Sequence, residues 1–125
     1  MSPAEIEALA RGFFDAIEAG DIEKVAATYA DDAVIWHNTD DEETSKAENV
    51  ATLANFIRYI PERRYEDRRL TTFPGGFVQQ HRLKGKRRDG VAVELAACIV
   101  CAVANGKITR LDEYFDAAQV AAWSR

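Results

Sequence analysis

Residues 20–38 have the sequence GDIEKVAATYADDAVIWHN, in which a short helix leads directly into a strand. Gly20 ends the helix before it, because glycine readily adopts the left-handed conformation that follows a helix, and the side chain of Asp21 can cap the next helix. The apolar residues after Asp21 recur at helical spacing. The β-branched and aromatic residues of 33–37 then predict a strand that ends at His37.

The flanking sequence extends this pattern to a single α+β domain over residues 1–125. Ser2 and Glu5 form a capping box at the start of a first helix, and Ser45 and Glu48 form another at the start of a third. Four strands follow this third helix, at 63–73, 77–87, 91–104 and 107–115, and a short helix ends the chain. The predicted order is ααβαββββα, a curved antiparallel sheet wrapped around the N-terminal helices into a cone-shaped α+β barrel with an open mouth.

Two dipeptides between the last strands predict tight hairpins. Asp89-Gly90 and Asn105-Gly106 are both favoured in the type I′ turn, because that turn needs positive φ at its two central residues.

Composition narrows the classes of function. The chain has 125 residues, of which 47% are hydrophobic and 30% charged, as in a globular protein. Its net charge of −5 disfavours nucleic acid and anionic membranes as partners. The sequence has no apolar run of about 18 residues and no leader pattern, and its two cysteines fit a reducing compartment, so we expect a cytoplasmic protein.

Three clusters that could indicate a ligand site have simpler structural interpretations. Cys98 and Cys101 are three apart on a predicted strand, so their side chains should point to opposite faces as two buried, inert thiols. The acidic run 40–43 lacks the spacing and central glycine of a calcium loop and is expected to be a solvated loop or a helix-cap region, which leaves no predicted metal site. The basic residues of 82–88 are typical of a charged strand edge and turn.

Residues 10–34, above all Gly20-Asp21-Ile22-Glu23 and Tyr29-Ala30-Asp31-Asp32-Ala33, resemble the NTF2-like superfamily. Within it the chain is similar to SnoaL-like polyketide cyclases, ketosteroid isomerases and limonene-epoxide hydrolases. The segment from Gly106 to Asp116 resembles the ending common to the SnoaL-like and epoxide-hydrolase branches. The resemblance implies the cone fold, a homodimer through the exposed face of the sheet, and an interior site for a small organic molecule. The fold itself serves enzymes and non-enzymes alike.

The catalytic residues of these relatives do not carry over intact. The resemblance puts His37 where the isomerases have an aspartate base, and Phe13 and Cys98 where they have an oxyanion-hole tyrosine and a neutral aspartate. Phenylalanine donates no hydrogen bond and a thiol donates a weak one, so that oxyanion hole is absent. The Asp-Arg-Asp unit of the epoxide hydrolases falls on Lys84, Arg82 and Glu113, where a cation replaces one carboxylate. One of Trp36, His37 and Asn38 matches their water-positioning residues.

His37, Glu113 and Arg82 are the candidate catalytic residues. An imidazole titrates near neutral pH and can act as a base or donor, although a histidine bonded to a backbone carbonyl is an equally good interpretation. Glu113 alternates with apolar residues on the last strand, so it needs a partner, and Arg82 is the natural one. An ion pair at the rim of the cone is the structural alternative. The remaining candidates are expected to line the ligand: Trp36, Asn38, Phe13, Glu94, Cys98 and Phe115.

The sequence therefore predicts a domain that binds a small, mostly apolar organic molecule in the cone. Acid/base chemistry of the isomerase, cyclase or hydrolase kind, without a cofactor, is the leading reaction class. The alternative is a non-catalytic ligand-binding or dimerisation module, which a cone packed by Phe13 and Leu111 would favour. Convergence of His37 with a carboxylate would favour the enzyme.

Overall fold

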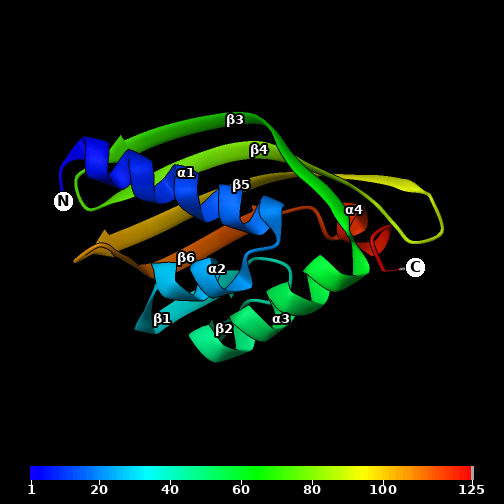
Figure 1. Cartoon of the computed structure of the whole chain (residues 1–125), viewed down its shortest axis with the longest axis horizontal. Helices are drawn as coiled ribbons and strands as arrows, with labels where there is room; N and C mark the ends of the chain where they lie inside the picture. The colour runs from blue at the N-terminus through cyan, green and yellow to red at the C-terminus, as the bar shows by residue number, and fades with distance from the viewer. Residues whose placement is uncertain (125) are drawn as a thin grey trace.

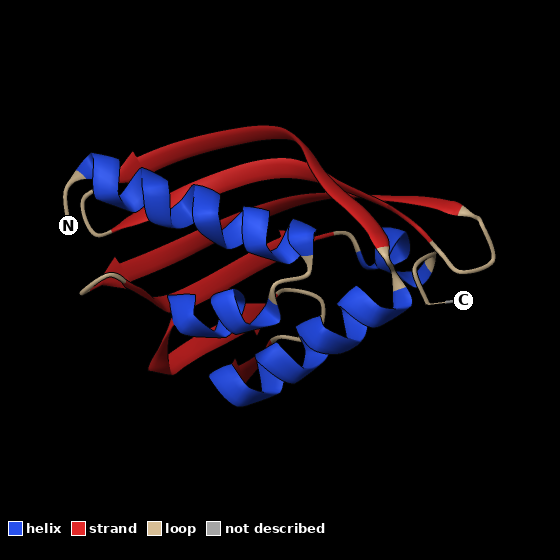
Figure 2. Cartoon of the chain, viewed as in Figure 1, coloured by secondary structure: helices blue, strands red, loops and turns tan. Residues whose placement is uncertain are grey.

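The computed structural model, which describes residues 1–124, is a curved sheet with its main helices on one face (Figures 1 and 2). The helices are α1 (Pro3–Ala19), α2 (Ile22–Thr28), α3 (Lys46–Tyr59) and α4 (Ala117–Ala121). The strands are β1 (Tyr29–His37), β2 (Glu42–Ser45), β3 (Glu62–Phe73), β4 (Gly76–Lys86), β5 (Ala92–Ala104) and β6 (Lys107–Phe115). This confirms the predicted α+β class and order, to which the structure adds the short strand β2.

Among residues 1–124 the six strands form one open sheet in the order β2-β1-β6-β5-β4-β3. Strands β3 to β6 make an antiparallel meander, as predicted, and β1 returns alongside β6 in a parallel pairing. The acidic segment predicted as a loop or cap region instead continues into β2, where Glu43 pairs with Trp36 at the sheet edge. The parallel pairing matters most for function, because it brings the end of the first long strand beside the end of the last.

Side-chain caps begin the helices where the sequence places them. The Ser2 hydroxyl accepts from the Glu5 N–H, and the Glu5 carboxylate accepts from the Ser2 N–H at 2.7 Å. Ser45 forms the same box at α3, and Asp21 and Asp116 cap α2 and α4. Each cap satisfies N–H groups that the first helical turn leaves free.

The two predicted hairpin turns differ. Asn105 and Gly106 both have positive φ, at 54° and 77°, as a type I′ turn requires. In the other hairpin only Gly90 has positive φ, and the loop spans 87–91, closed by a hydrogen bond from the Arg87 N–H to the Val91 carbonyl at 2.9 Å. The type I′ prediction for Asp89-Gly90 is therefore wrong, because Asp89 uses its side chain to accept from the Val91 N–H instead.

Aromatic side chains fill the space between α1 and the sheet. Phe13 and Phe14 meet edge to face at 5.3 Å, Phe13 meets Tyr29 at 5.4 Å, and Phe14 meets Phe77 at 6.3 Å. All four are fully or almost fully buried. Burial of this kind stabilises by roughly 1.5–3 kcal/mol for each large apolar side chain.

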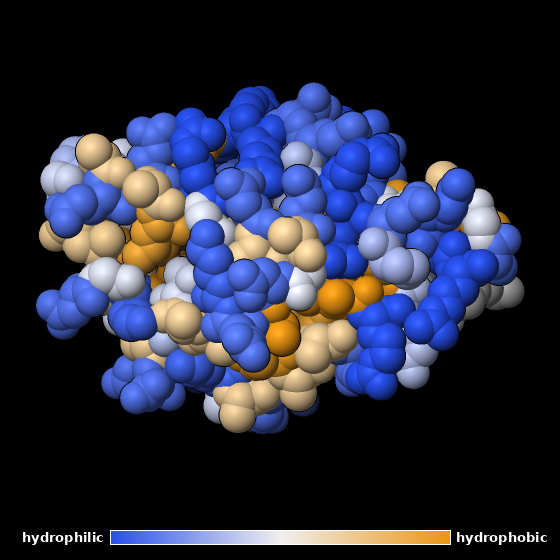
Figure 3. All heavy atoms as spheres, viewed as in Figure 1, coloured by the Kyte–Doolittle hydropathy of each residue, from blue (hydrophilic) through white to orange (hydrophobic). Residues whose placement is uncertain are grey.

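The helix-covered side of the molecule is mostly hydrophilic, with apolar atoms visible in the seams between the helices (Figure 3). Within residues 1–124 the structure contains no helix of the length and apolar character needed to cross a bilayer.

Candidate functional site

The parallel pairing of β1 and β6 brings His37 opposite Glu113. Both lie two residues beyond buried core positions, Ile35 and Leu111, so their side chains face the helix-covered inner side of the sheet. The imidazole Nε2 lies 3.2 Å from the Glu113 Oε1, and the two side chains are 24% and 19% exposed. They form a half-buried carboxylate–imidazole pair that is partly exposed to solvent.

This pair changes the protonation behaviour of the histidine. The pKa of His37 is raised above its ordinary value of 6.5, first because the Glu113 carboxylate accepts a hydrogen bond from the ring. Burial opposes this rise in the pKa, and the charges of Glu113 and Asp40 add to it. A proton on Nε2 is thus held against a carboxylate, which is the arrangement needed to pass a proton to and from a ligand.

Asn38 and Phe115 fix the geometry of the pair. The Phe115 N–H donates to the Asn38 Oδ1 at 3.0 Å, and the Asn38 Nδ2 donates to the Phe115 carbonyl at 3.1 Å. The Asn38 amide thereby replaces a strand partner and holds the end of β6 in place. The Phe115 ring meets the His37 imidazole edge to face at 5.8 Å. Of the two predicted lining residues, Phe115 borders the pair, whereas the Asn38 amide is engaged with backbone.

A second histidine, which the sequence analysis missed, lies deeper on the inner face. His81 is 4% exposed, and its ring lies edge to face with Tyr65 at 4.6 Å and with Phe14 at 5.4 Å. The Gln79 Nε2 lies 3.0 Å from His81 Nδ1. Burial lowers the pKa of His81 to about 4, so its ring is neutral at physiological pH. The alternation of side chains along a strand could have identified His81. It lies four residues after the buried Phe77 on the same strand, and residues an even number apart face the same side.

The strand registers arrange these groups in two neighbouring rows across the inner face. Pairing aligns Gln79 with Ile99, Ile99 with Glu113, and Glu113 with His37. The next row aligns His81 with Ala97 and Ala97 with Phe115.

Burial is the main cause of the raised pKa of Tyr65, and the nearby negative charge of Glu113 adds to it. The same charge opposes the lowering of the pKa of His81, so this carboxylate acts on both interior groups.

The expected ion pair between Arg82 and Glu113 does not form. Arg82 follows His81 on β4 and therefore points to the outer face of the sheet, where its side chain is 52% exposed. There its Nη1 lies 3.1 Å from the Glu94 Oε1, and its Nε lies 3.7 Å from the Asp67 Oδ2. Glu94 is thus also on the outer face, away from the His37–Glu113 pair. The expectation put Arg82 on the inner face. Consecutive residues of a strand alternate between its two faces, so Arg82 lies on the face opposite to His81.

The remaining predicted lining residues lie elsewhere. Trp36 is on the outer face, where its Nε1 donates to the Asp41 carboxylate at 2.9 Å. Cys98 is also outer and half-buried, while Cys101 is buried inside, so the two thiols diverge as predicted, although Cys98 is not buried. Phe13 belongs to the aromatic core.

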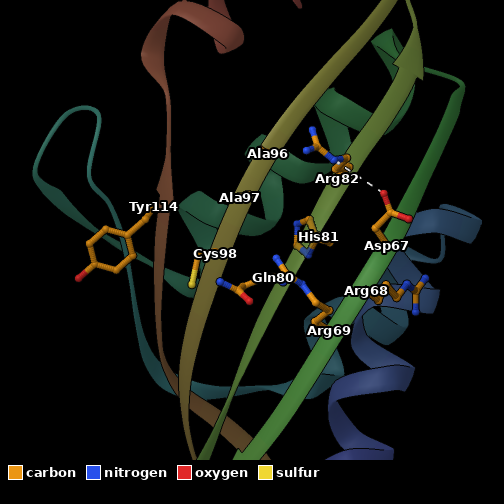
Figure 4. A pocket seen from close by; sticks show the side chains of 10 residues that line it. All are labelled: Asp67, Arg68, Arg69, Gln80, His81, Arg82, Ala96, Ala97, Cys98 and Tyr114. Carbon is orange, nitrogen blue, oxygen red and sulfur yellow. Dashed lines mark ion pairs between the residues drawn. The ribbon is translucent and has the colours of Figure 1, made fainter.

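An outer-face groove lies over the middle of the sheet, with a volume of ≈670 Å³ (Figure 4). Its lining residues include Arg69, Gln80, Arg82, Cys98 and Tyr114. The association of two copies through this face stays a prediction.

The end of the chain covers one end of the inner face. The Trp123 ring packs against Phe56 at 5.8 Å, and a Cβ added to Gly85 would lie 2.9 Å from the Trp123 ring. Only glycine at position 85 lets the indole approach the strand this closely. The Gln119 side chain ties α4 to the sheet by accepting from the Ala96 N–H at 3.1 Å.

Comparison with known proteins agrees with this architecture. The family model described as "SnoaL-like domain" matches residues 10–111. A search of curated proteins finds no significant match to this sequence.

Several solved structures have the same fold. AclR of Streptomyces galilaeus has a TM-score of 0.87 at 16% identity, over 97% of this chain and 81% of that one. A Xanthomonas campestris pv. campestris protein assigned as a polyketide cyclase has a TM-score of 0.86 at 16% identity, over 97% of each chain. An epoxide hydrolase of M. tuberculosis, similar to limonene-epoxide hydrolase, has a TM-score of 0.81 at 18% identity, over 97% of this chain and 90% of that one. At such low identities these likenesses establish the fold alone.

Proposed function

This chain belongs to the SnoaL-like domain family, and we propose that it binds a small, mostly apolar organic molecule at the inner face of the sheet and catalyses a proton transfer on it without a cofactor. The observation that carries the proposal is the contact of 3.2 Å between His37 and Glu113 on the inner face. Fold neighbours named as an epoxide hydrolase and assigned as a polyketide cyclase support this class of chemistry.

Within the pair, Glu113 is the base. Burial is the main cause of the raised pKa of Tyr29 and of Tyr65, and the negative charge of Glu113 adds to both. The carboxylate takes a proton from a carbon of the ligand, and the electron pair of the broken C–H bond enters the ligand's π system. Glu113 then returns the proton to another atom of the ligand, which completes an isomerisation or cyclisation. His37 donates a hydrogen bond to the carboxylate and orients it throughout.

The packed centre of the domain favours a second candidate, a ligand-binding module without catalysis. Phe13 and Leu111 are 1% and 4% exposed, so hydrocarbon fills the middle of the cone. The His37–Glu113 pair lies beyond this core, at the ends of β1 and β6. The two candidates differ in one measurable property, which is whether the pair moves a proton.

The test is deuterium exchange at the carbon next to the carbonyl of α-tetralone, a bicyclic ketone, followed by NMR in D₂O. Glu113→Gln keeps the shape of the side chain and removes the base, and we expect it to lower the enzyme-catalysed exchange by a factor of about 10²–10⁴. Glu94→Gln is the matched control, since Glu94 pairs with Arg82 on the outer face, and should exchange at the wild-type rate. Equal rates in wild type and Glu113→Gln would instead support the binding module.

A further inference from the structure

The groove on the outer face of the sheet contains a row of side chains that crosses four strands. Strand pairing aligns Arg69 of β3 with Gln80 of β4, Gln80 with Cys98 of β5, and Cys98 with Tyr114 of β6. All four residues line the groove, which has a volume of ≈670 Å³ (Figure 4). Tyr114 follows Glu113 on β6, and consecutive strand residues face opposite sides. The sheet itself therefore separates this row from the acid/base pair on the inner face.

A β-bulge in β3 shapes one side of the groove. The pairing of β3 with β4 shifts between Glu66 and Arg69, so that Asp67 and Arg68 together stand opposite His81. Asp67 adopts the left-handed conformation, with φ 54°. A bulge bends its strand and re-aims the side chains beside it. Here Arg68 turns toward α1, while Arg69 lies over the groove (Figure 4).

Small side chains on β5 form the floor of the groove, and longer ones form its walls. Cys98 faces outward between Gln80 of β4 and Tyr114 of β6, and Ala96 faces the same side two residues earlier. The Tyr114 ring is 47% exposed and meets Trp36 edge to face at 5.2 Å, which fixes its position. A flat ring can therefore lie on a methyl group and a sulfur atom with an aromatic side chain as its far wall.

The groove contains one guanidinium group without an acidic partner. Arg68 pairs with carboxylates of α1, and Arg82 pairs with the carboxylates of Glu94 and Asp67. In the part of the chain that the structure describes, residues 1–124, Arg69 forms no ion pair. Because the two acids beside the groove are already engaged by Arg82, an anion that pairs with Arg69 would have to come from another molecule.

We propose that this groove binds a planar aromatic carboxylate. The carboxylate accepts hydrogen bonds from the Arg69 guanidinium and the Gln80 amide, and the ring lies over Cys98 with its edge toward Tyr114. A guanidinium presents two parallel donors that match the two oxygens of a carboxylate. One unpaired guanidinium balances one negative charge, so a monocarboxylate fits better than a dianion. The site is separate from the proposed acid/base site and does not depend on it.

A second copy of the chain is the alternative occupant of this face. A two-fold contact would bury the same groove on both copies. Arg69 would then lose its water without gaining an acidic partner, since Asp67 and Glu94 are engaged by Arg82. Burying an unpaired charge is costly. A small carboxylate supplies the missing charge and leaves the rest of the face in water, so the groove favours the ligand.

Two naphthalene derivatives that differ in charge test the proposal, by isothermal titration calorimetry on the full chain. The carboxylate 2-naphthoate should bind wild type about tenfold more tightly than the neutral 2-naphthamide, because charge-assisted hydrogen bonds are the stronger ones. Arg69→Gln should abolish this preference. Arg64→Gln is the matched control and should keep it, since Arg64 lies on the same strand and pairs with Glu66 outside the groove.

Nuclear Overhauser effects locate the ligand in the wild-type protein, so this measurement decides even if Arg69→Gln does not fold. The naphthyl protons of bound 2-naphthoate should give cross-peaks to the Ala96 methyl group and to the Tyr114 ring, which both line the groove. Cross-peaks to Leu111 instead would place the ligand on the inner face.

Four results would overturn the proposal. They are no binding of 2-naphthoate, equal affinity of wild type for the two probes, an unchanged preference in Arg69→Gln, and cross-peaks to Leu111 in place of those to Ala96 and Tyr114. Sedimentation velocity explains a failure to bind, because a stable dimer would show that a second copy covers the groove. The deuterium exchange assigned to Glu113 is unaffected by any of these results.

Discussion

On strand β4, His81 and Arg82 are neighbours in sequence but face opposite sides of the sheet. Arg82 is 52% exposed and shares its charge with Glu94 and Asp67, in pairs that water screens. His81 is 4% exposed, has a lowered pKa, and leaves one ring nitrogen without a partner. The two residues show how the two faces differ. The outer face carries many charges that pair with one another, whereas the inner face carries a few polar groups that are buried and held in place by their neighbours.

The same contrast holds along β6. Leu111 and Glu113 face the helices, while Arg110 and Asp112 lie on the outer side and pair with one another at 2.9 Å. Glu113 has His37 as its partner and raises the pKa of several buried groups around it. A charge on the inner face therefore lies among buried titratable neighbours, where water screens it less than it screens a charge on the outer face.

The largest difference between the faces should appear in stability. Ile99 is 4% exposed on the inner face of β5, and Val100, the next residue, is half-buried on the outer face. Ile99→Ala should lower the free energy of unfolding by about 2–5 kcal/mol, because it removes buried methyl groups and leaves a cavity. Val100→Ala should cost less than about 1 kcal/mol in the monomer. Urea denaturation of both variants measures the two values, and equal losses would contradict the assignment of faces.

The next effect concerns pH, where the two histidines should act in opposite directions. The pKa of His81 is about 4 in the folded protein and 6.5 ordinarily, so between these values the unfolded chain binds a proton that the folded chain does not. Stability from His81 is complete above pH 6.5 and falls by about 3 kcal/mol as the pH drops to 4. His37 has a raised pKa, so its contribution is complete below pH 6.5 and is lost as the pH rises through its folded pKa.

Unfolding of wild type, His81→Phe and His37→Ala over pH 4–8 separates these contributions. Relative to wild type, His81→Phe should gain stability as the medium becomes acidic, because the phenylalanine has no proton to bind. His37→Ala should lose most at low pH and approach wild type at high pH. Parallel curves for the wild type and His81→Phe would mean that residue 81 is not buried as a neutral ring.

Local sequence signals were sufficient for the elements and insufficient for the site. The capping boxes at Ser2 and Ser45 and the turn at Asn105-Gly106 depend on contacts within a few residues, so the sequence alone predicts them. The contact between His37 and Glu113 depends on a parallel pairing of strands about 80 residues apart, which no short motif specifies. The sequence identified both residues, but not that they are partners.

The misplacement of Arg82 and the omission of His81 have the same physical origin. If a strand is assigned one residue out of phase, its two faces are exchanged. The predicted pairing of Arg82 with Glu113 therefore put Arg82, a residue of the outer face, on the inner face. The same shift concealed His81, whose neighbours in sequence are polar although its neighbours in space are aromatic. The inner apolar residues Phe77 and Leu83 fix the phase of β4 and would have corrected the interpretation.

The smallest expected effect is that of Arg82→Ala, which tests the outer face directly. An ion pair this exposed contributes only about 0–1 kcal/mol, because water screens the charges and ordering two long side chains costs entropy. Urea denaturation should show a loss of that size, reduced further in high salt. Deuterium exchange of α-tetralone should be unchanged, since Arg82 pairs with Glu94 on the outer face, whereas Glu113 pairs with His37 on the inner face. A loss of exchange comparable to that of Glu113→Gln would place the guanidinium in the site and exchange the two faces of β4.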